Sequence, residues 1–160
     1  MIKKKPWSGR FKESLSQQAL DFSVSLQFDK RLYAEDITAS IAHARALARV
    51  KVLSKAELKK IIRALEGIKI AIKNKKARLS PGLEDIHMNI ESLLSKKVGK
   101  MGLKIHTGRS RNDQVVTDLR LYLKKEIGEI SARIRAFEKV IIMLAEKYFG
   151  VIIPGYTHKQ

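Results

Sequence analysis

The segment 107–113 gathers residue types that bind an anion. It contains two arginines, a serine, an asparagine and a glycine, and it runs into the longest helical pattern of the chain. Free backbone amides and the positive end of a helix dipole meet at such a point, which favours a carboxylate or a phosphate. An ordinary helix cap is the alternative, with Asn112 or Asp113 as the N-cap and Arg109 and Arg111 on the surface. Residue types alone weigh the two interpretations equally.

The histidines are the second group that could do chemistry. His158 follows Thr157 after a Pro-Gly turn, and an imidazole there is suited to acid or base catalysis near neutral pH. A lone histidine is more often structural, which is our interpretation of His43; His87 fits a supporting or capping role, and His106 adjoins the polar loop. The four histidines show no metal-ligand spacing and the chain has no cysteine. We therefore expect no metal, disulfide or thiol nucleophile.

Helical periodicity defines the elements that must hold these residues. Residues 33–52 carry apolar side chains at steps of three and four. A capping-box pattern at 54–57 opens a second helix that extends to residue 72, and the short connection predicts antiparallel neighbours. A third, short helix is predicted over 84–98, followed by a turn and a polar loop. Residues 1–34 show no sustained helical period.

The longest pattern runs from Val116 to Tyr148, where apolar residues recur with a mean step of about 3.6. A helix of that length measures roughly 50 Å, whereas a compact domain of this size is about 30–35 Å across. Such a helix needs partners along its length, and bundle packing between chains would supply them. The elements together predict an all-α fold.

Length and charge limit the function classes. The chain has 160 residues and a net charge of +17, from 33 Lys+Arg against 16 Asp+Glu. A basic chain suits a polyanionic partner, but only 6% of the residues are aromatic, and base stacking needs aromatic side chains. We expect no nucleic-acid partner and keep a basic nucleic-acid-binding module as a minor alternative. No apolar run suits a membrane span or a secretory signal, so we expect a cytoplasmic protein without a membrane partner.

Four polar motifs follow one another along the chain. They are WSGRF at 7–11, EDIHMNIE at 84–91, TGRSRNDQ at 107–114 and PGYTH at 154–158. In this order and spacing they resemble the argininosuccinate lyases of the fumarase/aspartase superfamily. Related fumarases and adenylosuccinate lyases carry a different sequence at 107–114. Lys159 departs from the pattern, because the family usually has leucine there.

The resemblance implies a fold and a reaction. The fold is an N-terminal helical domain, residues 1–104, carrying part of the site, followed by the first long helix of a central helical bundle, residues 105–160. The reaction needs no cofactor. Argininosuccinate loses a proton from the carbon beside a carboxylate, the carbanion is held as an aci-carboxylate, and the carbon–nitrogen bond breaks to give arginine and fumarate. This is the last step of arginine biosynthesis, and the family's enzymes are homotetramers whose sites each draw on three subunits.

The resemblance also assigns residues and predicts a limit. Six positions correspond to the family's site: His158 as the acid/base group, and Ser25, Asp29, Arg111, Asn112 and Thr157 as substrate-binding residues. It covers only the first third of the family's length, and the loop that supplies the family's catalytic serine has no counterpart in these 160 residues. We therefore expect a lyase fragment that is inactive by itself. An inert truncated product or a pseudogene remnant is the alternative.

Overall fold

The computed structural model describes residues 16–158, and the regular elements in that range are all helical. The predicted all-α class is therefore confirmed. The motif at 7–11 and Lys159 lie outside the described residues. The chain divides into two compact units, residues 1–122 and 123–160. The domain boundary expected after residue 104 stays a prediction.

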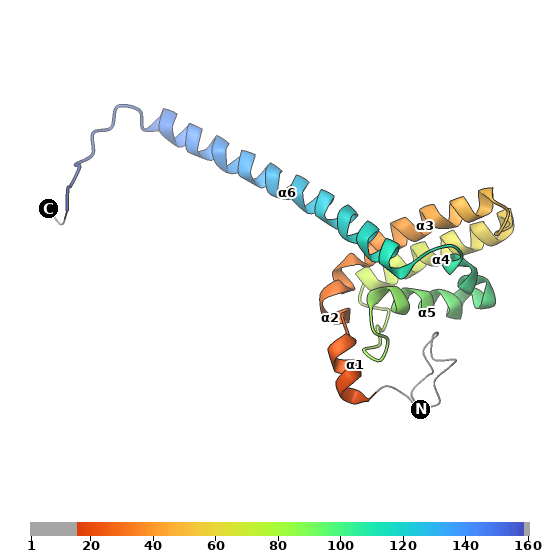
Figure 1. Cartoon of the computed structure of the whole chain (residues 1–160). Coiled ribbons are helices and arrows are strands. Elements are labelled where there is room, and N and C mark those ends of the chain that lie inside the picture. The colour runs from red at the N-terminus through yellow and green to blue at the C-terminus, as the bar shows by residue number, and fades with distance from the viewer. Residues whose placement is uncertain (1–15, 159–160) are drawn as a thin grey trace. The chain divides into compact units, whose positions relative to one another are not determined.

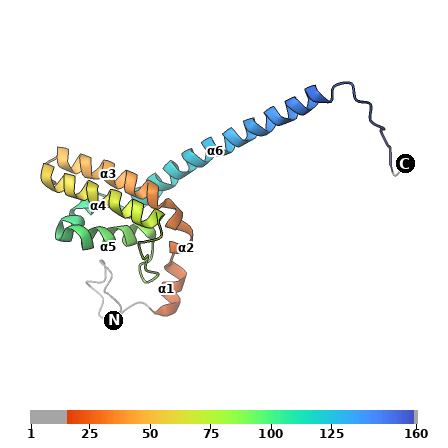
Figure 2. The same cartoon turned by 180° about the vertical axis from the view of Figure 1, so that it is seen from behind.

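Three helices form the body of the first unit: α3 (Tyr33–Arg49), α4 (Lys55–Lys73) and α5 (Ile86–Val98). The chain runs out along α3 and returns along α4, and both views show the two helices side by side (Figures 1 and 2). The capping box predicted at the start of α4 is confirmed. The Glu57 amide donates to Ser54 Oγ at 3.2 Å, and the Ser54 amide donates to Glu57 Oε2 at 2.8 Å.

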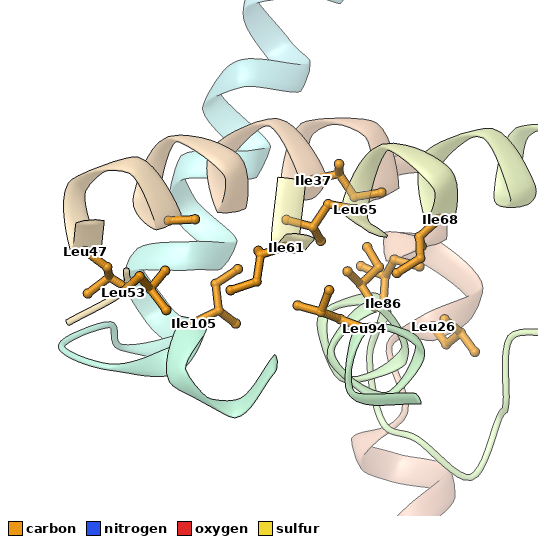
Figure 3. Close-up of a cluster of buried hydrophobic side chains, with 12 residues drawn as sticks. Leu26, Ile37, Leu47, Leu53, Ile61, Leu65, Ile68, Ile86, Leu94 and Ile105 are labelled. Atoms are coloured by element: carbon orange, nitrogen blue, oxygen red, sulfur yellow. The ribbon is translucent and has the colours of Figure 1, made fainter. Parts of the chain in front are cut away.

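Apolar side chains from these helices meet in one core (Figure 3). Ile37 of α3, Ile61 and Leu65 of α4, and Ile86 and Leu94 of α5 are fully or almost fully buried. Truncating such a residue to alanine typically costs about 2–5 kcal/mol, because it removes buried surface and leaves a cavity. The core therefore fixes the distances between the polar faces of α3 and α5.

The segment before α3 is helical, which the sequence pattern did not predict. It forms α1 (Gln17–Ser23), α2 (Leu26–Asp29) and the 3-10 turn η2 (Lys30–Leu32). Each element is too short to show a helical period. Tertiary contacts fix the second half of the segment instead, since Leu26 is buried in the core and the Ser25 amide donates to the Glu84 carbonyl oxygen at 2.9 Å.

The connection from α5 to α6 is more ordered than the predicted turn and polar loop. A 3-10 helix, η3 (Gly99–His106), occupies most of it. Gly102 allows η3 to approach α5, because a Cβ there would lie 3.2 Å from the Ser95 backbone. Lys104 of η3 donates to Glu57 at 2.6 Å, and this bond together with the capping bonds lowers the pKa of Glu57 to about 2. The irregular loop is thereby shortened to residues 107–110.

The predicted long helix is confirmed as α6 (Arg111–Lys147), 37 residues in length. Its first turns belong to the first unit, where Gln114 and Asp118 are buried. In the second unit an apolar stripe of α6 is exposed: Leu123, Ile127, Ile130, Ile134, Phe137, Ile141 and Leu144. Among the helices of residues 16–158, none combines the length and apolar character needed to cross a bilayer.

Candidate active site

Ser25 and Asp29 meet at the start of α5. The Ser25 hydroxyl donates to Asp29 Oδ2 at 2.6 Å, and Oδ1 of that carboxylate accepts from the Ile86 amide at 3.2 Å. Partial burial raises the pKa of Asp29 above its ordinary value, although the Ser25 hydrogen bond acts in the opposite direction. Two of the predicted site residues therefore share one corner of the first unit.

Polar side chains of the segment 84–91 build the turn at this corner. Asp85 is the N-cap of α5, and its carboxylate accepts from the Met88 amide at 2.6 Å. The buried Asn89 carboxamide accepts from the Ser80 amide at 2.7 Å and donates to the Asp85 carbonyl oxygen at 2.9 Å. The turn is therefore held by side chains, which satisfy backbone groups that no helix or sheet ladder pairs.

Arg111 opens α6 and its guanidinium faces the same turn. Its Nε atom lies 3.5 Å from Asp85 Oδ2, and its Nη2 atom lies 3.3 Å from Glu91 Oε2. Glu91 Oε1 in turn lies 3.1 Å from His106 Nδ1. The Nη1 atom of Arg111 donates to Gln114 Oε1 at 2.5 Å. Two carboxylates of the chain thus balance the charge of Arg111, and an anionic ligand would compete with them for this guanidinium.

The loop 107–110 is attached to α3. Arg109 Nη1 donates to Ser40 Oγ at 2.9 Å, and His43 Nε2 lies 3.1 Å from the Thr107 carbonyl oxygen. Gly108 adopts a φ of +66°, a left-handed conformation that favours glycine. His43 thus has a structural contact, and Arg109 holds the loop in place rather than pointing free toward a ligand.

Ser110 caps α6, which corrects the alternative interpretation that Asn112 or Asp113 would do so. The helix begins at Arg111, and the Asn112 amide donates to Ser110 Oγ at 3.2 Å. The two candidate cap positions lie two and three residues after Ser110, because the apolar period starts after the first polar turn of α6. Asn112 lies in that first turn with its side chain exposed.

A buried polar cluster lies between α3, α5 and α6. His87 Nδ1 lies 3.2 Å from Asp36 Oδ1 and 3.3 Å from Asp118 Oδ2, and all three residues are at most 1% exposed. Burial and the neighbouring Asp36 carboxylate raise the pKa of Asp118 to about 8. Burial acts in the same direction on Asp36, but hydrogen bonds from His87 and Gln114 hold its pKa below the ordinary value. His87 is therefore a core residue of this cluster, not a helix cap.

The same three residues have the chemical types of a divalent-cation site. Their ligand atoms lie within 4.8 Å of one another. Their contacts are those of a hydrogen-bonded cluster, however, since Asp36 Oδ1 already accepts from Gln114 Nε2 and lies at hydrogen-bonding distance from His87 Nδ1. The spacing along the sequence did not reveal this group, because its members come from three separate helices.

Thr157 and His158 belong to the second unit, whereas the other four predicted residues belong to the first. Both follow α6 in a segment without regular structure, and both are exposed. His158 has a φ of +58°, an uncommon value for a residue other than glycine. The structure thus brings Ser25, Asp29 and Arg111 to one turn, and the roles of all six predicted residues stay predictions.

Comparison with known proteins decides the family. A family model described as "Lyase" matches residues 9–160. The chain belongs to this lyase family. Similar curated members are the argininosuccinate lyases of Geobacter sulfurreducens, 50% identical over 160 residues, and of Carboxydothermus hydrogenoformans, 51% identical over 156 residues. The alignments cover 100% and 98% of this chain but only 35% and 34% of the two relatives. This lyase-family chain therefore spans about a third of the length of the curated relatives that it matches.

Several organising residues of this lyase-family chain were not predicted from the sequence, although His43 was interpreted as structural. On α3 the polar residues Asp36, Ser40 and His43 recur at steps of four and three, and each contacts a residue of the loop or of α6. On α6, Gln114 and Asp118 follow Arg111 at steps of three and four. The polar residues of each helix thus form a stripe beside the apolar one, and this stripe could have indicated them from the sequence. Only the apolar stripe was used to predict the helix.

Proposed function

We propose that this chain forms the N-terminal part of an argininosuccinate lyase and supplies part of its active site. The proposal is supported by identities near 50% over the whole chain to relatives named argininosuccinate lyase. The observation that carries it in the structure is the meeting of Ser25, Asp29 and Arg111 around the N-terminus of α5. A hydroxyl, a carboxyl and a guanidinium at one turn suit a substrate that carries both carboxylates and a guanidinium.

The reaction is an elimination that balances without a cofactor. A base removes the proton from the carbon beside a carboxylate, and the electron pair forms the carbon–carbon double bond of fumarate as the carbon–nitrogen bond breaks. The guanidino nitrogen leaves with the bonding pair and, after protonation, becomes part of arginine. Negative charge develops on the carboxylate next to the reacting carbon, so donors placed there lower the barrier. His158 is the acid/base residue in this proposal.

The substrate-binding roles follow from the same chemistry. Ser25, Asn112 and Thr157 contact the substrate, and Asp29 lines the site through its bond to Ser25. Arg111 binds a substrate carboxylate in a bidentate manner, replacing one of its contacts to Asp85 or Glu91. The exchange of one carboxylate for another leaves the guanidinium paired in both states. Binding therefore does not leave the partly buried guanidinium unpaired.

Assembly and location complete the proposal. The exposed apolar stripe of α6 favours self-association into the homotetrameric helical bundle of the family. Each site would then be built from several subunits. In this proposal Thr157 and His158 contribute to a site that forms only when the subunits assemble. We place the enzyme in the cytoplasm, with argininosuccinate as its small-molecule substrate.

A chimaera tests the proposal. The matching third of the Geobacter sulfurreducens enzyme is replaced by this chain, which is 50% identical to it. We expect tetramers that convert argininosuccinate to arginine and fumarate, followed by fumarate absorbance and by amino-acid analysis. The 160-residue chain assayed alone is expected to form no fumarate.

The outcomes separate folding from function. A chimaera that assembles but shows no turnover contradicts the proposal, as does turnover by the isolated chain at a rate similar to that of a relative. A chimaera that does not assemble is replaced by the same exchange in the Carboxydothermus hydrogenoformans enzyme, which is 51% identical. If that second chimaera also fails to assemble or to turn over, the proposal is rejected.

A further inference from the structure

The side chain of Gln114 joins Arg111 to the buried cluster of Asp36, His87 and Asp118. Arg111 Nη1 donates to Gln114 Oε1 at 2.5 Å, and Gln114 Nε2 donates to Asp36 Oδ1. Gln114 is only 2% exposed. Both ends of its carboxamide are therefore engaged away from water. A continuous chain of polar contacts runs from the guanidinium at the turn to the interior of the first unit.

The orientation of the Gln114 carboxamide is determined by its partners. A guanidinium can only donate hydrogen bonds, so the group facing it must be the carbonyl oxygen of the amide. An ionised carboxylate can only accept, so the group facing Asp36 must be the amide nitrogen. Reversing the amide would set two donors against each other and two acceptors against each other. The two hydrogen bonds from Arg111 to Gln114 and from Gln114 to Asp36, which we call the relay, therefore have only one satisfied arrangement. This arrangement fixes the position of the oxygen that Arg111 contacts.

The cluster keeps Asp36 in the acceptor form that this relay needs. Around the two carboxyl groups lie His87 of α5, Gln114 of α6, and the charges of Glu35 and Arg109. Asp36 Oδ2 and both oxygens of Asp118 are buried without a hydrogen-bond partner. A proton on Asp118 avoids two adjacent buried charges. The raised pKa of Asp118 and the lowered pKa of Asp36 agree with that distribution.

We propose that Gln114, held by its hydrogen bond to the buried Asp36, is a positioning residue that sets the orientation of the Arg111 guanidinium for a substrate carboxylate. The inference rests on the proposed function in one respect, that Arg111 binds the substrate. Gln114 does not touch the substrate in this arrangement. It fixes one of the three nitrogen atoms of the guanidinium, while the other two face the exchangeable carboxylates of Asp85 and Glu91. Without it, Arg111 would have to lose side-chain freedom when the substrate binds.

The first test uses the 160-residue chain and needs no catalysis. Gln114→Met removes both polar ends at nearly constant volume, and Gln18→Met makes the same chemical change at an exposed position. The readout is the side-chain Nε–H resonance of Arg111 in ¹⁵N NMR, assigned by its loss in Arg111→Lys. In the parent chain and in Gln18→Met we expect a dispersed signal with a backbone-like heteronuclear NOE. In Gln114→Met we expect it to move toward the signals of exposed arginines with a reduced NOE.

Further measurements keep the test decisive. An unchanged Arg111 signal in a folded Gln114→Met chain overturns the proposal. If Gln114→Met does not fold, Asp118→Asn is used, because an asparagine can donate to Asp36 without titrating. We expect Asp118→Asn to retain the ordered Arg111 signal, and its loss in a folded chain contradicts the proposed relay.

The second test separates the inference from the proposed function. In the active chimaera, Gln114→Met is expected to raise KM for argininosuccinate about tenfold with little change in kcat. The substitution removes one hydrogen bond to the charged Arg111, which in this proposal binds the substrate and the transition state equally well, so its loss weakens both to the same extent. A fall in kcat alone overturns the positioning role. An inactive parent chimaera counts against the proposed function, while the NMR result on the 160-residue chain still decides whether Gln114 orders Arg111.

Discussion

Asp36 and Asp118 lie beside the same ring nitrogen, since His87 Nδ1 is 3.2 Å from one carboxyl group and 3.3 Å from the other. Both aspartates are fully buried, at 0% exposure. They come from α3 and α6, so their meeting ties the beginning of the long helix to the helical body of the first unit. When two carboxyl groups lie this close together and are shielded from solvent, a state in which one of them keeps its proton is favoured.

The first prediction concerns the pH dependence of stability. Burial and Asp36 raise the pKa of Asp118 to about 8 in the folded chain, against an ordinary value of 3.8. The folded state therefore holds a proton that the unfolded state releases, and this stabilisation is complete below about pH 4 and lost as the pH rises toward 8. The contribution of Asp118 should lower the free energy of unfolding by at most about 1.4 kcal/mol for each pH unit of increase in this window.

Urea denaturation at pH 5, 6, 7 and 8 measures the effect. Asp118→Asn removes the titrating group with little change in volume, so its unfolding free energy should fall less over this range than that of the parent chain. Asp113→Asn, an exposed change on the same helix, should leave the slope of the parent chain intact. Equal slopes for the parent chain and Asp118→Asn would show that Asp118 is already ionised in the folded state.

The second prediction concerns Arg111 in the active chimaera. Replacing it by glutamine removes the charge that we propose for substrate carboxylate binding, and should lower kcat/KM by about tenfold or more. Arg63→Gln, at an exposed position on α4, makes the same change away from the turn and should leave kcat/KM near that of the parent. Steady-state kinetics of the two variants, with tetramer content measured in parallel, checks the prediction. Equal losses in both would mean that overall charge, and not this site, matters.

The third prediction concerns His158. His158→Asn in the chimaera should lower turnover by about a hundredfold or more, the usual contribution of an acid/base residue. The residue is exposed in the segment after α6, so the oligomer and its thermal stability should not change. Turnover is measured together with sedimentation velocity. Near-normal turnover in an intact tetramer would exclude His158 from the mechanism.

The fourth prediction concerns the apolar stripe of α6. Ile130 and Phe137 are 55% and 65% exposed, which is unfavourable in water at roughly 25 cal/mol per Å² of apolar surface. We expect the 160-residue chain to self-associate through this stripe, and Ile130→Lys to shift it toward monomer in sedimentation equilibrium. Glu138→Lys, an exposed polar position on the same helix, serves as the matched control. Monomeric behaviour of the parent chain at high concentration would argue against the stripe as a contact surface.

Local chemistry was sufficient to predict the main helices. The apolar period of α3, α4 and α6 and the Ser54–Glu57 capping box are properties of neighbouring residues, and they hold in the structure. The short helices before α3 were not predicted, because a segment such as Leu26–Asp29 depends on the core that buries Leu26. The cap of α6 was misplaced because its Ser110 precedes the apolar pattern.

The sequence by itself determined the helical class, the faces of the main helices, and the polar motifs that resemble a lyase site. Only the tertiary structure decided which polar residues meet. Gln114 bonds to Asp36 across 78 positions, and Arg109 bonds to Ser40 across 69. No period or motif encodes such a pairing, because it depends on how the core sets α3 against α5 and the first turns of α6. Once those helices are packed, burial removes water from Asp36 and Asp118, and that desolvation is the main cause of the raised pKa of Asp118.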